Sequence, residues 1–122
     1  MACQRVAVLG ASPKAGRFSN RAVKALAAHG HEVIPVNPAY PEVEGLSTFP
    51  DLFAVKGPVD TLSVYIAPER IVPHIPGIIA LRPGRVILNP GTESPLLMEA
   101  LDNAGIPCVT QCTLVMLSSG KF

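Results

Sequence analysis

The residues best suited to binding chemistry lie in one short polar segment, residues 10–20, which reads GASPKAGRFSN. Ser12 and Ser19 offer hydroxyl groups, and Lys14 and Arg17 offer positive charge. Two glycines allow the backbone to approach a ligand closely. The segment leads into an expected helix, whose first backbone N–H groups and positive dipole end attract anions. This combination predicts a binding site for a ligand that carries phosphate groups.

The same segment lacks the signatures of two common nucleotide-binding loops. The dinucleotide fingerprint G-x-G-x-x-G would need glycines at the positions that Ser12 and Ala15 hold. The segment is not a Walker loop either. NAD-binding domains also place Asp or Glu after the second strand to hold the ribose diol, whereas this chain has Asn37-Pro38. An NAD(P)-binding oxidoreductase or redox sensor therefore stays an alternative that lacks its usual ribose anchor.

Apolar β-rich runs alternate with helix-like stretches along the chain, which is typical of a parallel sheet covered by helices. The expected strands are residues 5–9, 31–36, 61–66, 85–88 and 108–111. A first helix is expected to be capped by Ser19 or Asn20, and the best-marked helix begins at Ser94-Pro95 and ends at Gly105. Residues 40–58 are expected to be irregular apart from a helical turn at 50–55, and prolines predict a split segment after the third strand.

These elements predict a Rossmann-like, doubly wound α/β fold with about five parallel strands, formed by a single domain over residues 1–122. Right-handed crossovers on both sides of the first strand predict the strand order 3-2-1-4-5. The carboxyl ends of parallel strands meet at one edge of the sheet. We therefore expect the loop after Leu9 to lie near the strand ends at Val36, Ile66 and Asn89.

Composition excludes several function classes. Only 16% of the residues are charged and the formal net charge is +1, so no broad positive field for nucleic acid or an anionic membrane is expected. The apolar N-terminal run is too short for a signal peptide, and no run reaches the roughly 18 residues of a membrane helix. Three cysteines without C-x-x-C spacing suggest neither disulfides nor zinc. A cytoplasmic protein is expected.

No catalytic or metal-ligating set can be recognised from the spacing of Ser, His, Asp or Cys residues, which favours a binding protein over an enzyme. His31 is expected to begin a strand, and His29 and His74 are expected on solvated helix ends. Cys112 is expected to be a buried inert cysteine or, if it lies near a ligand thiol, a partner for a mixed disulfide.

Residues 10–38, GASPKAGRFSNRAVKALAAHGHEVIPVNP, resemble the opening of the CoA-binding protein family, small proteins similar to the CoA-binding domain of succinyl-CoA synthetase alpha subunits. The segments VYIAP and LNPG look like the ends of the third and fourth strands in that family. The late segment QCTLVML keeps the cysteine of the family but lacks the charges that commonly surround it, and Asn89-Pro90-Gly91 stand where the family more usually has a Gln-rich strand end near the thiol end of the ligand.

The resemblance implies that coenzyme A (CoA) lies across the first loop. The residues that it assigns to the phosphates are Gly10, Ala11, Ser12, Arg17 and Ser19, with Asn20 completing the loop and with Lys14 and Arg21 as candidates for the extra ribose phosphate. Val36, Asn37 and Pro38 would border adenine and ribose. Ile66, Ala67 and Pro68 would form the opposing wall, and Asn89, Pro90 and Gly91 would approach the pantetheine arm.

The prediction is therefore a module that binds CoA or an acyl-CoA, without catalysis or with a regulatory role. A third interpretation is an interaction subunit of an acyl-CoA synthetase, with the apolar residues 114–117 as its docking surface. A homodimer is a further expectation for the assembly.

Overall fold

The computed structural model describes residues 3–122, so Met1 and Ala2 of the predicted domain lie outside the described residues. Five parallel strands form the central sheet: β1 (Arg5–Leu9), β2 (Glu32–Val36), β5 (Thr61–Val64), β6 (Arg85–Leu88) and β7 (Cys108–Val109). A small antiparallel hairpin consists of β3 (Glu42–Val43) and β4 (Leu46–Ser47). The helices are α1 (Phe18–Ala28), α2 (Ile75–Leu81), α3 (Pro95–Ala104) and α4 (Thr113–Ser118), and the 3₁₀ turns are η1 (Leu52–Ala54), η2 (Pro68–Arg70) and η3 (Val72–His74).

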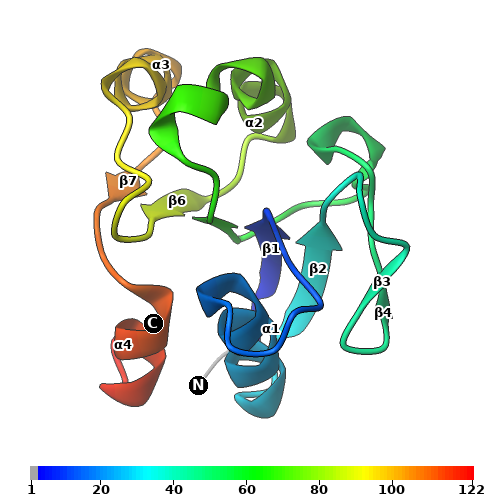
Figure 1. The fold of residues 1–122 in the computed structure, drawn as a ribbon. Helices are drawn as coiled ribbons and strands as arrows, with labels where there is room; N and C mark the ends of the chain where they lie inside the picture. The colour runs from blue at the N-terminus through cyan, green and yellow to red at the C-terminus, as the bar shows by residue number, and fades with distance from the viewer. Residues whose placement is uncertain (1–2) are drawn as a thin grey trace.

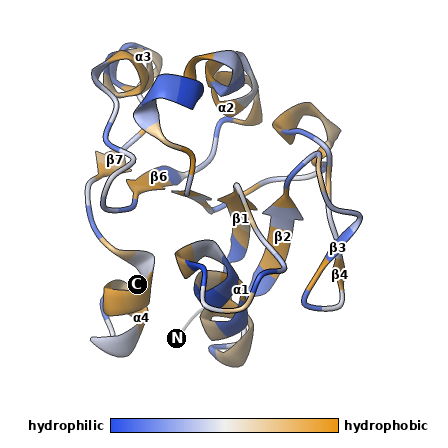
Figure 2. Ribbon diagram, in the orientation of Figure 1, coloured by the Kyte–Doolittle hydropathy of each residue, from blue (hydrophilic) through white to orange (hydrophobic). Residues whose placement is uncertain are grey.

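The sheet forms the middle of three layers, with α1 and α4 on one face and α2 and α3 on the other (Figure 1). Alternation along the strands explains why both faces are apolar. In β1, Val6 and Val8 pack toward α1, whereas Ala7 and Leu9 pack on the opposite face. Colouring by hydropathy shows the apolar residues along the sheet and polar residues at the hairpin tip (Figure 2). The predicted Rossmann-like α/β class is confirmed.

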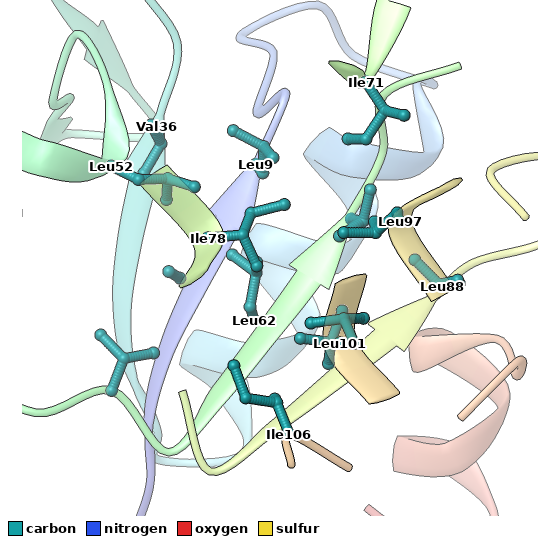
Figure 3. Close-up of a cluster of buried hydrophobic side chains, with 14 of the residues drawn as sticks. Leu9, Val36, Leu52, Leu62, Ile71, Ile78, Leu88, Leu97, Leu101 and Ile106 are labelled. Carbon is teal, nitrogen blue, oxygen red and sulfur yellow. The ribbon is translucent and has the colours of Figure 1, made fainter. Parts of the chain in front are cut away.

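The larger part of the core lies between the sheet and the pair α2 and α3. Leu62 of β5 lies at its centre, with Ile78 of α2 and Leu101 of α3 against it (Figure 3). Leu52 of η1 joins the same cluster. This turn therefore anchors the long connection between β2 and β5 where a helix would ordinarily cover the sheet.

The strand order differs from the predicted one. The observed order is β2-β1-β5-β6-β7, so the third predicted strand pairs with β1 and not with the outer side of β2. Phe49 occupies that outer side, because its N–H donates to the carbonyl of Pro35 at 3.0 Å and its own carbonyl accepts from the N–H of Asn37 at 2.9 Å. Pro35 itself lacks an N–H, which suits an edge strand. The strand order reverses between β1 and β5, which is where a ligand crevice is expected.

Several local predictions also need correction. Helix α1 begins at Phe18 with Arg17 at its N-cap and no side-chain cap, so neither Ser19 nor Asn20 caps it. The connection after β2 is not irregular throughout, because it contains the β3–β4 hairpin. The third and fifth strands end earlier than predicted, at Val64 and Val109.

Other local predictions are confirmed. Ser94 Oγ accepts the N–H of Leu97 at 3.2 Å, and α3 ends at Gly105 in the left-handed conformation. The predicted turn within residues 50–55 is η1, where Asp51 Oδ1 accepts the N–H of Ala54 at 3.0 Å. The proline-rich segment after β5 is split into η2, η3 and α2, as expected.

The C-terminal residues return to the sheet. Helix α4 packs against α1, and Met116 and Leu117 are buried. Met116 and Leu117 are therefore not available for the predicted apolar docking surface of residues 114–117, whereas Leu114 is half-buried and Val115 is exposed. Beyond the helix, the ring of Phe122 lies 5.0 Å from that of His31 and 4.6 Å from the Arg85 guanidinium carbon. In the part of the chain that the structure describes, no helix is long and apolar enough to cross a membrane.

Candidate functional site

Three adjoining hollows follow the edge of the sheet at the carboxyl ends of β2, β1 and β5, and we call them together the groove. The inner hollow, of about 210 Å³, is lined by Leu9, Gly10, Val36, Asn37, Pro38, Pro50, Asp51, Ile66, Arg70 and His74. The loop hollow, of about 470 Å³, is lined by Gly10, Ser12, Arg17, Phe18, Ser19, Asn37, Ala39, Tyr40, Tyr65, Ile66 and Arg70. The hairpin hollow, of about 360 Å³, is lined by Asn37, Pro38, Ala39, Tyr40, Pro41, Thr48 and Pro50. Shared lining residues make the three hollows continuous.

The groove exists because the chain turns sharply at Gly10. Its N–H donates to the carbonyl of Val36 at 3.0 Å, and the next strand approaches so closely that a Cβ on Gly10 would lie 2.9 Å from Ile66 Cδ1 and 3.1 Å from the carbonyl oxygen of Tyr65. The φ of +88° is also one that L side chains rarely adopt. Only glycine lets β1 pass into its loop while the end of β5 lies against it.

The loop hollow combines positive charge with unsatisfied hydrogen-bond donors. Arg17 and Arg70 line it, and within residues 3–122 its lining contains no acidic side chain. The first N–H groups of a helix have no intrahelical acceptor, and those of α1 receive no side-chain cap. Ser12 and Ser19 line the same hollow, and Ser12 Oγ accepts the N–H of Lys14 at 3.1 Å, which leaves its hydroxyl free to donate. These groups can hold an anion such as a phosphate.

The side chain of Asn37 shapes the groove with both ends of its amide. Asn37 Nδ2 donates to the carbonyl of Ala11 at 2.8 Å, and its Oδ1 accepts the N–H of Ala39 at 2.8 Å. Asn37 therefore fixes the end of β2 to the loop after β1. At this position it offers no carboxylate for a ribose diol.

The inner hollow contains polar residues that sequence reasoning missed. Leu9, Val36 and Ile66 give it apolar sides, and Asp51, Arg70 and His74 lie at its rim. Burial, and secondly the charge of Arg70, lower the pKa of the His74 imidazole. His74 lies at a helix end as predicted, at the N-cap of α2, but it is half-buried there and not solvated.

A fourth hollow of about 110 Å³, the Cys112 hollow, continues from the loop hollow through the shared residues Phe18 and Tyr65. Asn89, Pro90 and Cys112 complete its lining. Burial raises the pKa of Tyr65 to about 12.

Asn89 is the centre of a buried hydrogen-bond network and not an open ligand group. Its Nδ2 donates to Ser63 Oγ and to the carbonyl of Val64, both at 2.9 Å, and its Oδ1 accepts the N–H of Thr113 at 2.9 Å. Thr113 Oγ1 lies 2.8 Å from Ser63 Oγ. The network ties the ends of β5 and β6 to the start of α4.

The structure brings many of the predicted site residues together. Gly10, Ser12, Arg17, Ser19, Val36, Asn37, Pro38 and Ile66 line the groove, and Asn89 and Pro90 line the Cys112 hollow. The predicted residues outside these linings are Ala11 and Asn20, which are fully buried, and Lys14, Ala67, Pro68 and Gly91. Arg21 stacks over the ring of Phe18 at 5.4 Å.

The residues that sequence reasoning missed come mainly from turns. Tyr40, Asp51, Arg70 and His74 belong to the connections after β2 and β5. The one available signal was position, since residues that follow a parallel strand lie at the same edge as the first loop. Nothing in the sequence indicated how far along each connection the groove extends.

The match to a family model decides the classification of this chain. Residues 4–118 match the model of the CoA binding domain. The chain belongs to this CoA-binding domain family. The Bacillus subtilis protein YneT, described as uncharacterized, is 35% identical over 68 residues, which cover 56% of this chain and 50% of that protein.

An ADP-forming acetate–CoA ligase of Archaeoglobus fulgidus is 37% identical over 68 residues, or 56% of this chain and 10% of the ligase. The chain thus spans half of one curated relative and a tenth of the other. A solved structure from Thermus thermophilus, cell-free ID.343, superposes with a TM-score of 0.90 at 36% identity, covering 98% of this chain and 91% of that one. This CoA-binding domain is therefore similar both to small proteins and to part of a ligase.

Proposed function

We propose that this chain binds coenzyme A or an acyl-CoA, with the nucleotide half in the groove, and that it acts by binding without catalysing a reaction. The observation that carries the proposal is the loop hollow, which Arg17 and Arg70 line and which lies at the uncapped N-terminus of α1. The diphosphate of CoA would lie there, because charge-assisted hydrogen bonds and helix N–H groups both favour phosphate oxygens. Membership of the family supports the same ligand.

The adenine ring would occupy the inner hollow. Leu9, Val36 and Ile66 provide apolar contact for a flat ring. The Asp51 carboxylate at the rim uses Oδ1 to cap η1, and its other oxygen can accept from an exocyclic amine. Arg70 borders both the inner hollow and the loop hollow, so it can contact the phosphates that follow the base.

The pantetheine arm would run from the loop hollow past Phe18 and Tyr65 into the Cys112 hollow. A mixed disulfide between Cys112 and CoA stays a prediction. In this exchange the Cys112 thiolate attacks CoA disulfide and releases one CoA thiolate. Mass spectrometry after incubation with CoA disulfide should place an adduct on Cys112 before Cys108, whose pKa burial raises. Labelling of Cys108 and Cys112 at equal rates would contradict this prediction.

Calorimetric titration with CoA tests the proposal. The Arg17→Ala variant should bind CoA roughly tenfold to a hundredfold more weakly, because one charge-assisted phosphate contact is lost. Lys56→Ala removes the same charge from an exposed residue that does not line the groove, and should bind as the wild type does. Absence of CoA binding to the wild type at high micromolar concentration refutes the proposed function.

A competition experiment between CoA and NADPH distinguishes the proposed CoA-binding function from the NAD(P)-binding alternative. Because Asn37 uses its amide internally, the end of β2 presents no acidic anchor to a ribose diol. NADPH should therefore fail to displace bound CoA at equal concentration. Displacement of CoA by NADPH would favour an oxidoreductase or redox sensor.

The similarity to part of an ADP-forming ligase favours a second candidate, a CoA-binding subunit that acts with a synthetase partner. Light scattering of the purified chain, alone and mixed with a ligase from which this domain has been deleted, distinguishes the two roles. A stable complex that restores ligase activity would support the subunit role.

A further inference from the structure

The β3–β4 hairpin turns on an unfavourable residue. Its two central residues, Glu44 and Gly45, have φ values of 51° and 78°. Two positive φ values are typical of a type I′ turn, for which Asn-Gly is the preferred sequence. Glutamate rarely adopts this conformation, since its Cβ crowds the following carbonyl. A strained residue that the structure maintains suggests a role outside the turn.

The Glu44 carboxylate reaches across to helix α1. Its Oε2 accepts from Asn20 Nδ2 at 2.9 Å, and its Oε1 lies 4.0 Å from Lys24 Nζ. The ion pair is partly exposed and contributes little. The bond to Asn20 differs, because Asn20 is fully buried beneath the loop that follows β1.

Asn20 transmits this contact to the loop. Its Nδ2 also donates to the carbonyl of Ser12 at 3.0 Å, so one amide group joins the hairpin tip to a residue that lines the loop hollow. Within residues 3–122, the buried Asn20 Oδ1 has no partner. The orientation of the amide is therefore set by its two donated bonds, and Glu44 provides one of them.

The other end of the hairpin forms the opposite wall of the groove. The N–H of Thr48 donates to the carbonyl of Pro41 at 3.1 Å, and both residues line the hairpin hollow together with Tyr40. Figure 1 shows the hairpin beside β2, at the edge of the sheet. The hairpin thus connects the wall at Tyr40 with the loop at Ser12, and fixing its tip fixes the distance between them.

We propose that Glu44 is a positioning residue for ligand binding: through Asn20 it holds the Ser12 loop and the hairpin wall at the separation that a phosphate-bearing ligand needs. This inference rests on the proposed function, because the ligand that reports on it is CoA. Glu44 thus combines an unfavourable turn conformation with a side chain long enough to bond Asn20.

The Glu44→Asn variant separates positioning from stability. Asparagine gives the hairpin its preferred Asn-Gly turn but is too short to bond Asn20, so the melting temperature should stay at or above that of the wild type. CoA affinity should nevertheless fall by roughly threefold to tenfold, as expected when one hydrogen bond is lost. Hydrogen exchange of the Lys14 and Arg17 amides in the free protein should become faster.

Two matched variants sharpen the test. Glu44→Gln retains an acceptor for Asn20 and should bind CoA within about twofold of the wild type. Lys24→Ala removes only the ion pair and should leave both affinity and loop exchange unchanged. If the wild type binds CoA and Glu44→Asn binds it equally well, with unchanged loop exchange, the positioning role is refuted. If the wild type does not bind CoA, the proposed function fails, while the exchange measurement still decides whether Glu44 orders the loop.

Discussion

The loop after β1 and the loop after β6 leave the same edge of the same sheet, both are polar, and both lead into a helix. In the first loop, helix α1 receives no side-chain cap and the Ser12 and Arg17 side chains line a hollow. In the second loop, Ser94 caps α3, and Asn89 and Thr92 are buried with their side chains hydrogen-bonded inside the protein. Polar groups that the protein leaves unsatisfied at an open edge favour a ligand, whereas polar groups that it satisfies internally stabilise the fold.

Removing the internal hydrogen bonds of the loop after β6 should have the largest effect on stability. Asn89→Ala removes three buried side-chain hydrogen bonds and should lower the free energy of unfolding by about 4 kcal/mol. Urea unfolding measures this change. Asn103→Ala, at an exposed position of α3, is the control and should cost less than about 0.5 kcal/mol. A loss of similar size in both variants would show that Asn89 is not a special site.

A pair of glycines compares the two loops directly. Gly10 and Gly91 share a φ of +88°, but only Gly10 has neighbours within 4 Å of an added Cβ. Gly91→Ala should therefore cost about 1 kcal/mol of unfolding free energy, from backbone strain alone. Gly10→Ala should cost about 3 kcal/mol and abolish CoA binding, because the end of β5 must move. Thermal unfolding and calorimetry measure both effects, and equal costs would contradict the role of close packing at Gly10.

Two serines should separate stability from binding, because Ser94 contributes to the stability of the protein and Ser19 to CoA binding. Ser94→Ala removes the cap of α3 and should cost about 1 kcal/mol of unfolding free energy without changing CoA affinity. Ser19→Ala should change stability by less than about 0.5 kcal/mol but weaken CoA binding roughly threefold. Urea unfolding and CoA titration of the same two preparations give all four values. The comparison of the loops is wrong if Ser19→Ala destabilises the protein as much as Ser94→Ala does.

Acid should destabilise the protein through two histidines. Burial is the main cause that holds the pKa values of His31 and His74 below the ordinary value of 6.5. As the pH falls through 6.5, these histidines take up protons in the unfolded chain before they do so in the folded protein. The free energy of unfolding should therefore fall as the pH is lowered from about 7.5 to about 5.5. Urea unfolding at both values measures the slope, which His74→Gln and His31→Gln should each reduce.

Bound CoA should separate the two histidines. His74 lies at the groove, where a phosphate would favour the protonated imidazole, whereas His31 lies at the opposite edge of the sheet. Saturating CoA should therefore weaken the pH dependence that His74 contributes and leave that of His31. If CoA changes the pH dependence of the free energy of unfolding equally in the His31→Gln and His74→Gln variants, no phosphate lies near His74.

Local signals predicted the parts of this fold that depend on local chemistry. Ser94, Pro95 and Gly105 mark the two ends of α3, and the structure confirms both. The Gly10 loop was predicted to follow the first strand, and it does, but this strand is the second of the five strands and not the central one, which is β5. The strand order was wrong, although Pro35 within β2 carried the signal for an edge strand.

Long-range contacts account for what could not be predicted. Asn20 looks like a helix cap in the sequence, but its amide bonds Ser12 and Glu44, and the latter lies 24 residues away. Arg70 and His74 reach the groove because η2 and η3 bring them back over the strand ends. Periodicity reports which residues face the core, and it does not report how turns direct polar side chains.

The position of Phe122 has a practical consequence for measurements on this protein. Its carbonyl accepts from Arg85 Nη2 at 3.2 Å, and its ring rests between Arg85 and His31, at the edge where the strands begin. A fluorophore or a biosensor surface coupled beyond residue 122 therefore points away from the groove. Immobilisation there should leave ligand access free, whereas coupling through exposed Lys14 would place the label on the loop that carries Ser12 and Arg17.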